Sequence, residues 1–197
     1  ARLSFLLTGA TPSVALLDAA AAGQLDTPEG VRAAAVQVLA EPGASEYLSD
    51  FFIALTGVGM VGEIEKTQDL LSVFDAELRQ SMFEETRIWL NEVVLAPGAD
   101  ALSLFDSDQT YVDARLAEFY GLPAPAVGFA AIQLPPETGR AGIFGKGSWL
   151  AVHASVDLSA PTRRGIFVMD HFLCQKVPAA PPDVTTELPD PDPTDGP

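Results

Sequence analysis

The sequence predicts an all-α protein, an irregular multi-helix bundle that ends in a proline-rich C-terminal strap. Apolar residues recur at intervals of three and four in segments that proline and glycine separate, as in amphipathic helices joined by turns. Thr-Pro pairs at 11–12 and 27–28 place a capping side chain and a proline at helix starts. From Pro178 onward the chain is rich in proline and aspartate and lacks lysine and arginine, which is typical of a linker.

The first part of the chain is expected to form short helices separated by turns. A short apolar helix opens the chain, and each Thr-Pro pair begins another. A further helix carries Tyr47, Phe51 and Leu55 on one stripe. The expected helices cover residues 2–7, 14–22, 28–39 and 45–55. Short helices alternating with turns favour a compact bundle.

Residues 75–95 give the strongest helix signal, with Leu78, Met82 and Trp89 on one apolar stripe. Glu85 falls on this stripe, so its carboxylate must be paired, hydrogen-bonded or protonated. A structural ion pair with Arg115 or Arg2 is the favoured interpretation, because buried charges are usually paired. The alternative is an acid of raised pKa, or a ligand-binding carboxylate.

The rest of the chain predicts three more helices around a turn-rich connection. The helices are expected at residues 111–120, 142–153 and 161–174. Between the first two, residues 122–141 hold four prolines and two glycines, with 129–132 as a short strand candidate. We therefore expect a helical domain over residues 1–121, a second helical segment over 122–177, and a linker over 178–197.

Charge and composition limit the classes of function. Acidic residues outnumber basic ones 27 to 11, and the formal net charge is −16. Such a field repels nucleic acid and anionic membranes, but it permits a cation or a basic partner. The longest apolar stretch, residues 51–61, is too short for a transmembrane segment. The first residue is Ala1 and not methionine, so we expect a processed protein or an excised fragment.

The sequence contains no motif that assigns catalysis. The one cysteine, Cys174, excludes an internal disulfide. His153 and His171 have no zinc-enzyme spacing around them, and we expect ordinary surface or half-buried histidines. Residues 145–148, Gly-Lys-Gly-Ser, suggest a phosphate loop, but Arg140 stands where its first glycine would be. Whether this chain is an enzyme stays open, and a non-catalytic role is favoured.

Scattered motifs together resemble two domains of the planctomycete-type multidomain surface cytochromes. The first resembles a domain of unknown function, through Arg2 to Leu6, Pro12, Leu16-Leu17, Met82, Glu85-Thr86, Tyr111, Arg115 to Ala117 and Tyr120-Gly121. The second resembles the start of the following haem-bearing domain, through Arg140 to Ile143, Ser148, Leu150-Ala151, His153-Ala154, Pro161, Arg164-Gly165, Leu173-Cys174, Pro178, Pro181-Pro182 and Val184.

The resemblance implies an exported, periplasmic or cell-surface polypeptide that takes part in electron transfer. It implies no cofactor in this chain, but haem c in a downstream segment with a Cys-x-x-Cys-His motif, and neighbouring domains as partners. His153 or Met169 is then a candidate sixth ligand to that haem. Cys174 is expected to be buried, or to pair with a cysteine beyond this chain.

Three functions compete on these grounds. The first is a non-catalytic scaffold or interaction module of the cytochrome-associated protein, which a closed core with a paired Glu85 would favour. The second is part of an extracellular enzyme completed by neighbouring domains, which a deep pocket containing Glu85, His153 or Arg164 would favour. The third is a cation- or carbohydrate-binding module, which a shallow acidic patch with bound calcium would favour.

Overall fold

A computed structural model describes residues 1–41, 43–67, 72–156 and 158–178 of the chain. The chain divides into two units, residues 1–160 and residues 161–197. The first unit contains all of the strands and all but one of the helices of the described part. Most of the predicted strap, residues 179–197, lies outside the described residues.

The fold is mostly helical, but the predicted all-α class is wrong, because two segments pair as an antiparallel sheet. Strand β1 (Gln109–Val112) pairs with β2 (Ala130–Gln133), and Thr110 lies opposite Ile132. Thr110 and Val112 are buried while their neighbours are half-buried, which is the period-two alternation of a strand. The helix predicted over residues 111–120 therefore begins only after this strand. Asp113 caps helix α8 (Ala114–Tyr120) by accepting the amide of Leu116.

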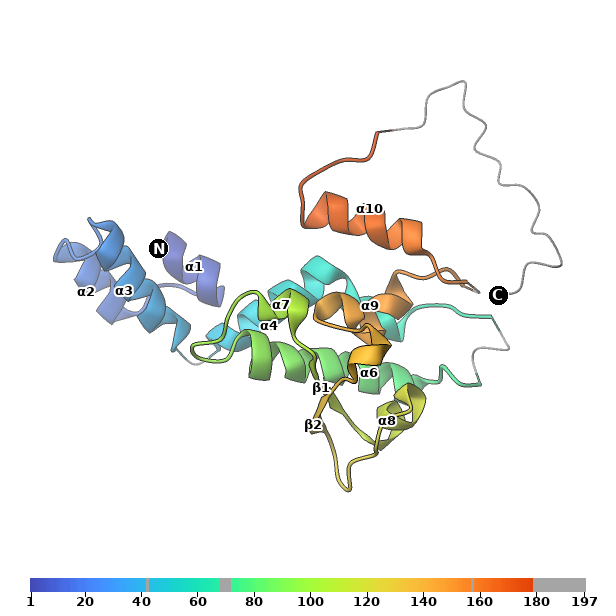
Figure 1. Ribbon diagram of the computed structural model, residues 1–197. Coiled ribbons are helices and arrows are strands. Elements are labelled where there is room, and N and C mark those ends of the chain that lie inside the picture. The colour runs from blue at the N-terminus through green and yellow to red at the C-terminus, as the bar shows by residue number, and fades with distance from the viewer. Residues whose placement is uncertain (42, 68–71, 157, 179–197) are drawn as a thin grey trace. The chain divides into compact units, whose positions relative to one another are not determined.

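Four helices form the N-terminal part of the first unit: α1 (Arg2–Thr8), α2 (Val14–Ala21), α3 (Pro28–Leu39) and α4 (Ala44–Thr56). The predicted cap of α3 is confirmed, because Thr27 accepts the amide of Gly30 and a proline follows it. The cap of α2 is Ser13 and not the predicted Thr11. Helix α1 packs on α3 and α4 (Figure 1).

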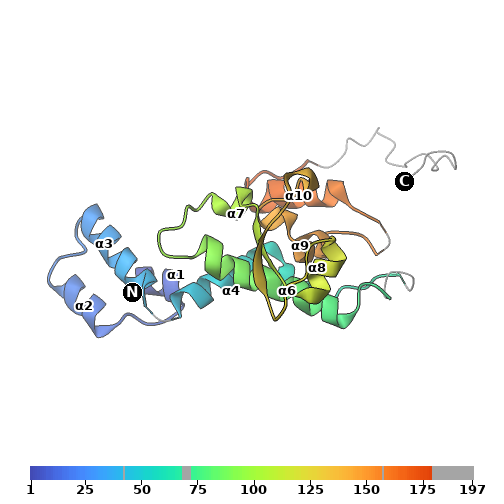
Figure 2. The ribbon, with the colours of Figure 1, turned by 60° about the horizontal axis from the view of Figure 1, so that its bottom comes forward.

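Helix α6 (Ala76–Trp89) is the central element of the first unit. It packs against the 3-10 helix η1 (Val58–Gly62), strand β1, helix α8 and helix α9 (Gly147–Val152). Figures 1 and 2 both show α6 beside α8 and α9. The predicted apolar stripe is confirmed, since Leu78, Met82 and Trp89 are buried. Glu85 is buried among them, at 0% exposure.

The predicted helix over residues 75–95 changes its geometry near its end. Residues Leu90–Val94 form a π-helical turn, η2, in which the amide of Leu95 bonds to the carbonyl of Leu90 at 2.8 Å. Such turns insert an extra residue into a helix and occur often at functional sites. Here η2 packs against α4 and carries Asn91.

Short elements complete the described chain. They are α7 (Ser103–Asp106) and the 3-10 turns η3 (Pro136–Thr138) and η4 (Ile143–Gly145), all in the first unit. Helix α10 (Pro161–His171) belongs to the second unit. The helix predicted over residues 142–153 is thus η4 followed by α9. The predicted domain limits at 121 and 177 remain predictions.

Candidate functional site

Four polar side chains meet in the interior of the first unit, and we call them the Glu85 cluster: Glu85, Thr110, Tyr120 and Lys146. The Thr110 hydroxyl donates to Glu85 Oε1 at 2.5 Å, and the Tyr120 hydroxyl donates to Glu85 Oε2 at 2.8 Å. Lys146 Nζ donates to Thr110 Oγ1 at 2.9 Å and to the Gln109 carbonyl at 3.1 Å. Thr110 therefore links the ammonium group to the carboxylate.

The surroundings of the cluster are closed and partly aromatic. Lys146 is 1% exposed, and its Nζ lies 4.3 Å from the centre of the Trp89 ring. The guanidinium carbon of Arg140 lies 3.9 Å from the centre of the Tyr120 ring. The Tyr120 hydroxyl also accepts the amide of Gly147 at 2.9 Å. Cations over aromatic faces gain electrostatic attraction, and this gain increases where water is excluded.

Burial changes the proton affinity of two members of the cluster. Burial lowers the pKa of Lys146 from 10.5 to about 8, although the charge of Glu85 opposes this shift. Burial also raises the pKa of Tyr120 well above 10, and the charge of Glu85 acts in the same direction. At neutral pH Lys146 is therefore mostly an ammonium and Tyr120 is a phenol, so both act as hydrogen-bond donors.

A lysine of lowered pKa beside a carboxylate is a pattern often found in active sites. Catalysis also requires that a substrate reach these groups. Glu85 and Thr110 are 0% exposed, and neither of the two described pockets is lined by a member of the cluster. In the described structure the Glu85 cluster is thus a buried internal contact.

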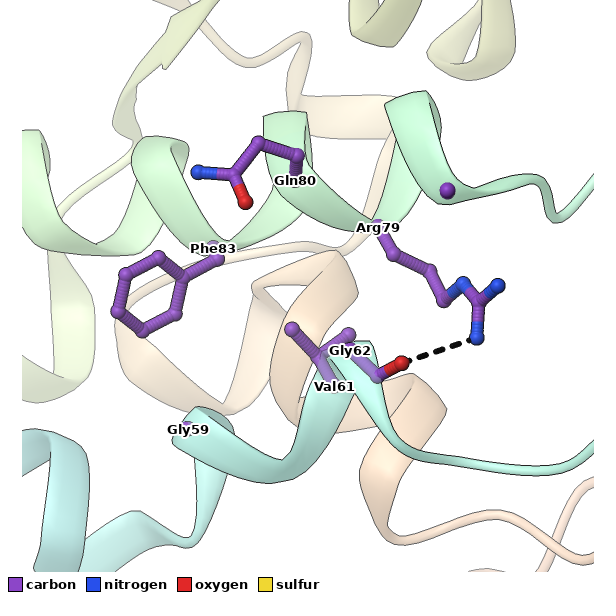
Figure 3. Close-up of a pocket in the computed structure, with 7 residues that line it drawn as sticks. Gly59, Val61, Gly62, Arg79, Gln80 and Phe83 are labelled. Atoms are coloured by element: carbon purple, nitrogen blue, oxygen red, sulfur yellow. Dashed lines mark hydrogen bonds between the residues drawn. The ribbon is translucent and has the colours of Figure 1, made fainter.

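The first pocket, of about 370 Å³, lies between η1 and α6 (Figure 3). Its lining residues are Gly59, Val61, Gly62, Ala76, Arg79, Gln80 and Phe83. Arg79 is the one charged residue among them, and its Nη1 donates to the Gly62 carbonyl at 3.0 Å, as Figure 3 shows. The same guanidinium donates through Nε to the Asp75 carbonyl at 3.3 Å. Arg79 thus joins η1 to the start of α6, and the lining offers no acid–base pair for catalysis.

The second pocket, of about 380 Å³, has a more polar lining. Its residues are Glu46, Ser49, Asp50, Arg87 and Asn91, from α4, α6 and η2. Three of the five residues are charged, so this pocket favours polar or charged ligands over apolar ones.

The structure does not bring Glu85 and Arg115 together as the predicted ion pair. Arg115 Nη2 donates to Asp75 Oδ2 at 2.9 Å, and Nη1 lies 3.7 Å from Glu118. The bond from the Leu78 amide and the Arg115 guanidinium hold the pKa of Asp75 below 3.8. Arg115 therefore stabilises the start of α6, while Thr110 and Tyr120 satisfy Glu85.

The two histidines each contact a main-chain carbonyl. A ring nitrogen of His153, Nε2, lies 2.9 Å from the Thr56 carbonyl, and its ring centre lies 5.0 Å from that of Trp149. His171 Nδ1 lies 3.1 Å from the Phe167 carbonyl. As a haem ligand through Nε2, His153 would have to break the bond to Thr56, and its role as a haem ligand stays a prediction.

Met169 and Cys174 belong to the second unit. Met169 lies half-buried in α10, and no contact in the described structure tests its predicted role as a haem ligand. Cys174 is exposed, so the prediction that it is buried is wrong. Its pairing with a cysteine outside this chain stays a prediction.

Sequence reasoning missed Thr110 and Tyr120 as partners of Glu85, and it missed Lys146 as the cation that Thr110 links to Glu85. One signal was available, because Lys146 is a single charge within the largely apolar stretch of residues 141–152. The phosphate-loop comparison considered that lysine but directed attention to a ligand and not to the core. No local signal connects it with Glu85, since the two lie in different helical regions.

Two further findings concern metals and membranes. Among residues 1–41, 43–67, 72–156 and 158–178, no three His, Cys, Asp or Glu side chains are grouped closely enough to hold a metal ion. In the same part of the chain, every helix is too short or too polar to cross a bilayer.

Comparison with known families separates the chain into two matches. Residues 1–122 match the family model PSD4, described as a protein of unknown function (DUF1592). Residues 140–195 match the family model PSCyt3, described as a protein of unknown function (DUF1588). No curated protein and no solved structure matches the chain significantly. The Glu85 cluster contains residues of both matched segments.

Proposed function

We propose that this chain, which belongs to the PSD4 family of proteins of unknown function, is a non-catalytic scaffold module of a larger cytochrome-associated protein. Its task is to hold two family segments together as one folded unit. The Glu85 cluster is the observation that carries this proposal.

The cluster depends on both segments. Glu85, Thr110 and Tyr120 lie in residues 1–122, whereas Lys146 lies in residues 140–195. Without Lys146, the Thr110 hydroxyl loses the ammonium donor that bonds to it at 2.9 Å, and the Gln109 carbonyl loses its bond at 3.1 Å. The buried ammonium of the second segment therefore depends on the first segment, where both of its hydrogen-bond partners, Gln109 and Thr110, lie.

Other contacts between the segments support the same reading. The hydroxyls of Thr86 and Ser148 bond at 2.6 Å inside the unit, where both residues are buried. The Gly142 amide donates to the Ser107 carbonyl at 2.8 Å. A Cβ on Gly142, whose φ is +53°, would lie 2.4 Å from the Phe105 carbonyl carbon. The close approach of residue 142 to the Phe105 carbonyl, together with its positive φ, thus requires glycine.

The cellular setting is part of the proposal. We infer an exported protein in which a longer polypeptide carries haem c downstream of these residues and uses it for electron transfer. The support is the cytochrome-type name of the PSCyt3 model and the residue resemblance described above. In this arrangement residues 1–160 provide structure, and His153 contributes to packing on Thr56.

Two measurements test the scaffold. We expect residues 1–160 to unfold cooperatively in urea, and residues 1–122 to lack a cooperative transition, because Lys146 and α9 are missing. Cooperative unfolding of 1–122 with similar stability would refute the proposed dependence.

In the longer polypeptide, we expect His153→Ala to leave the haem absorption spectrum unchanged. A shifted spectrum would make His153 a haem ligand and this chain more than a scaffold.

The lowered pKa of Lys146 favours one alternative, an enzyme whose site opens when neighbouring domains bind. The reactivity of the lysine distinguishes the two. In the longer polypeptide, a scaffold keeps Lys146 protected from acylating reagents at pH 8, whereas an active-site lysine reacts there faster than an exposed one.

A further inference from the structure

The arginine that lines the pocket between η1 and α6 has no carboxylate partner. Within the described residues, every hydrogen bond that Arg79 donates goes to a main-chain carbonyl. Its Nε bonds to Asp75 at 3.3 Å, and its Nη1 bonds to Gly62 at 3.0 Å and to Ile64 at 3.5 Å. In the same part of the chain, no acidic side chain forms an ion pair with it. The carbonyl groups thus hold the guanidinium in position but leave its positive charge unbalanced.

The guanidinium of Arg79 keeps donors for a ligand. A guanidinium carries five N–H donors, and Nη2 forms no hydrogen bond within the described residues. Arg79 is half-buried, and Figure 3 shows its side chain reaching from α6 to η1, with Val61 between it and Phe83. A ligand in the pocket can therefore meet a cation that is accessible and already held in place, which lowers the entropy cost of binding.

The rest of the lining is mostly apolar and contains no acidic residue. Phe83 lines the pocket while it packs against the buried core of the unit. Val61 and Ala76 add smaller apolar walls. The whole chain has 27 acidic and 11 basic residues, so a pocket with one positive and no negative side chain differs from the average of the chain. Such a lining favours an anion that carries an apolar group.

The acidic side chains near the pocket oppose an anion only weakly. Four of them stand next to lining residues in the sequence: Glu63, Asp75, Glu77 and Glu84. Asp75 forms an ion pair with Arg115, and Glu84 forms one with Arg87, so two of the four charges are balanced. Glu63 and Glu77 are exposed, where water and salt screen their charges.

We propose that this pocket binds a carboxylate attached to an aromatic group. Positions 79 and 83 are one helical turn apart on the same face of α6, about 6 Å along the helix axis. A carboxylate can pair with Arg79 Nη2 while a ring joined to it by two methylene groups contacts Phe83. The pocket volume of about 370 Å³ lies within the range of small-molecule sites, about 300–1,000 Å³. This site is independent of the scaffold proposed above.

The probe is 3-phenylpropionate, titrated into the 197-residue chain at pH 7 in about 0.1 M sodium chloride, where distant charges are screened. Amide chemical shifts in NMR locate the binding and give the affinity. We expect saturable shifts in η1 and in residues 76–83 of α6. The neutral analogue 3-phenylpropanamide has the same shape without the charge, and we expect its binding to be weaker by about tenfold or more.

A matched pair of alanine substitutions tests the location. Ala76 is exposed and is the first residue of α6, where a negative charge favours the helix, so Ala76→Glu should fold. Because Ala76 lines the pocket, the new carboxylate should repel the ligand or pair with Arg79, and lower the affinity by about tenfold or more. Ala15→Glu is the control, because it adds the same charge at an exposed position in the first turn of α2, outside the lining.

Several results would overturn the proposal. These are the absence of saturable shifts at millimolar acid, equal affinity for the neutral amide, and an equal loss of affinity in Ala15→Glu and Ala76→Glu. Unchanged affinity in a folded Arg79→Gln variant would also overturn it, and Arg79 would then only link η1 to α6. Thermal unfolding followed by tryptophan fluorescence verifies that each variant is folded.

The carboxylate could come from a small acid or from the C-terminal residue of a protein partner. N-acetyl-phenylalanine distinguishes these sources, because it is the same acid with the peptide amide of a chain end. Tighter binding of N-acetyl-phenylalanine indicates a protein terminus, and tighter binding of 3-phenylpropionate indicates a small acid. The methyl ester of either compound should not bind, and unchanged binding of the esters would refute recognition of the carboxylate.

Discussion

The Thr110 hydroxyl is the most sensitive point of the Glu85 cluster, because it bonds to both charged groups at once. It donates to Glu85 Oε1 at 2.5 Å and accepts from Lys146 Nζ at 2.9 Å. Thr110→Val keeps the shape of the side chain and removes both hydrogen bonds. Valine also suits a strand, so the backbone of β1 is not the element at risk.

The expected cost follows from these contacts. Hydrogen bonds to charged groups contribute about 1.5–3 kcal/mol each, which gives about 3–6 kcal/mol for two. Lys146 keeps its bond to the Gln109 carbonyl, so we expect the lower half of this range, about 3–4 kcal/mol. Thr110→Ser is the matched control. It keeps the hydroxyl and loses one buried methyl group, for about 1 kcal/mol.

Urea unfolding followed by tryptophan fluorescence measures both variants. Trp89 and Trp149 are buried in the unit, at 0% and 3% exposure, and report its unfolding. We expect the valine variant to lose at least about 2 kcal/mol more unfolding free energy than the serine variant. If valine and serine destabilise the protein equally, or valine stabilises it, the hydroxyl does not link the two charges as described.

Three other predictions concern the same unit. Acetic anhydride labelling of the native chain at pH 8 should modify the exposed Lys176 much faster than the buried Lys146, and equal rates would show that solvent reaches the cluster. Because the pKa of Lys146 is about 8 in the folded state and 10.5 is its usual value, the unfolded chain binds more protons between pH 8 and 10. The unfolding free energy should therefore rise over this window, by at most about 1.4 kcal/mol per pH unit, relative to Lys146→Met at the same pH values. Asp75→Ala should lower the urea midpoint of unfolding, because it removes the α6 cap that Leu78 donates to, and a midpoint equal to that of the parent chain would contradict that role.

Local signals in the sequence were sufficient to predict some of the helices. The stripe of Leu78, Met82 and Trp89 predicted both α6 and its buried face, because the 3.6-residue period is read within one segment. Thr27 and Pro28 predicted the start of α3 for the same reason. The anomaly at Glu85 was also visible, since a charge on an apolar stripe breaks the pattern.

The partners of Glu85 could not be predicted in this way. They come from positions 25 and 35 residues away in sequence, at Thr110 and Tyr120, and from Lys146 beyond them. Arg115 was the predicted partner because the charges were complementary, but in the fold its guanidinium bonds to Asp75. Strand β1 was missed because four residues provide only two cycles of alternation, and the Asp113 cap that separates it from α8 was read as part of one helix.

The energetics of Lys146 indicate what the cluster contributes. Its pKa is lowered although Glu85 attracts its charge, so the cost of burying the ammonium exceeds that attraction. The pair is thus a weak source of net stability, and apolar residues of similar size could stabilise the core as well. Its effect is on uniqueness, because any other register of residues 140–152 would separate the buried Lys146 ammonium from the Thr110 hydroxyl and the Gln109 carbonyl. We infer that this requirement selects one docking of the second family segment on the first, which is the property that a scaffold needs.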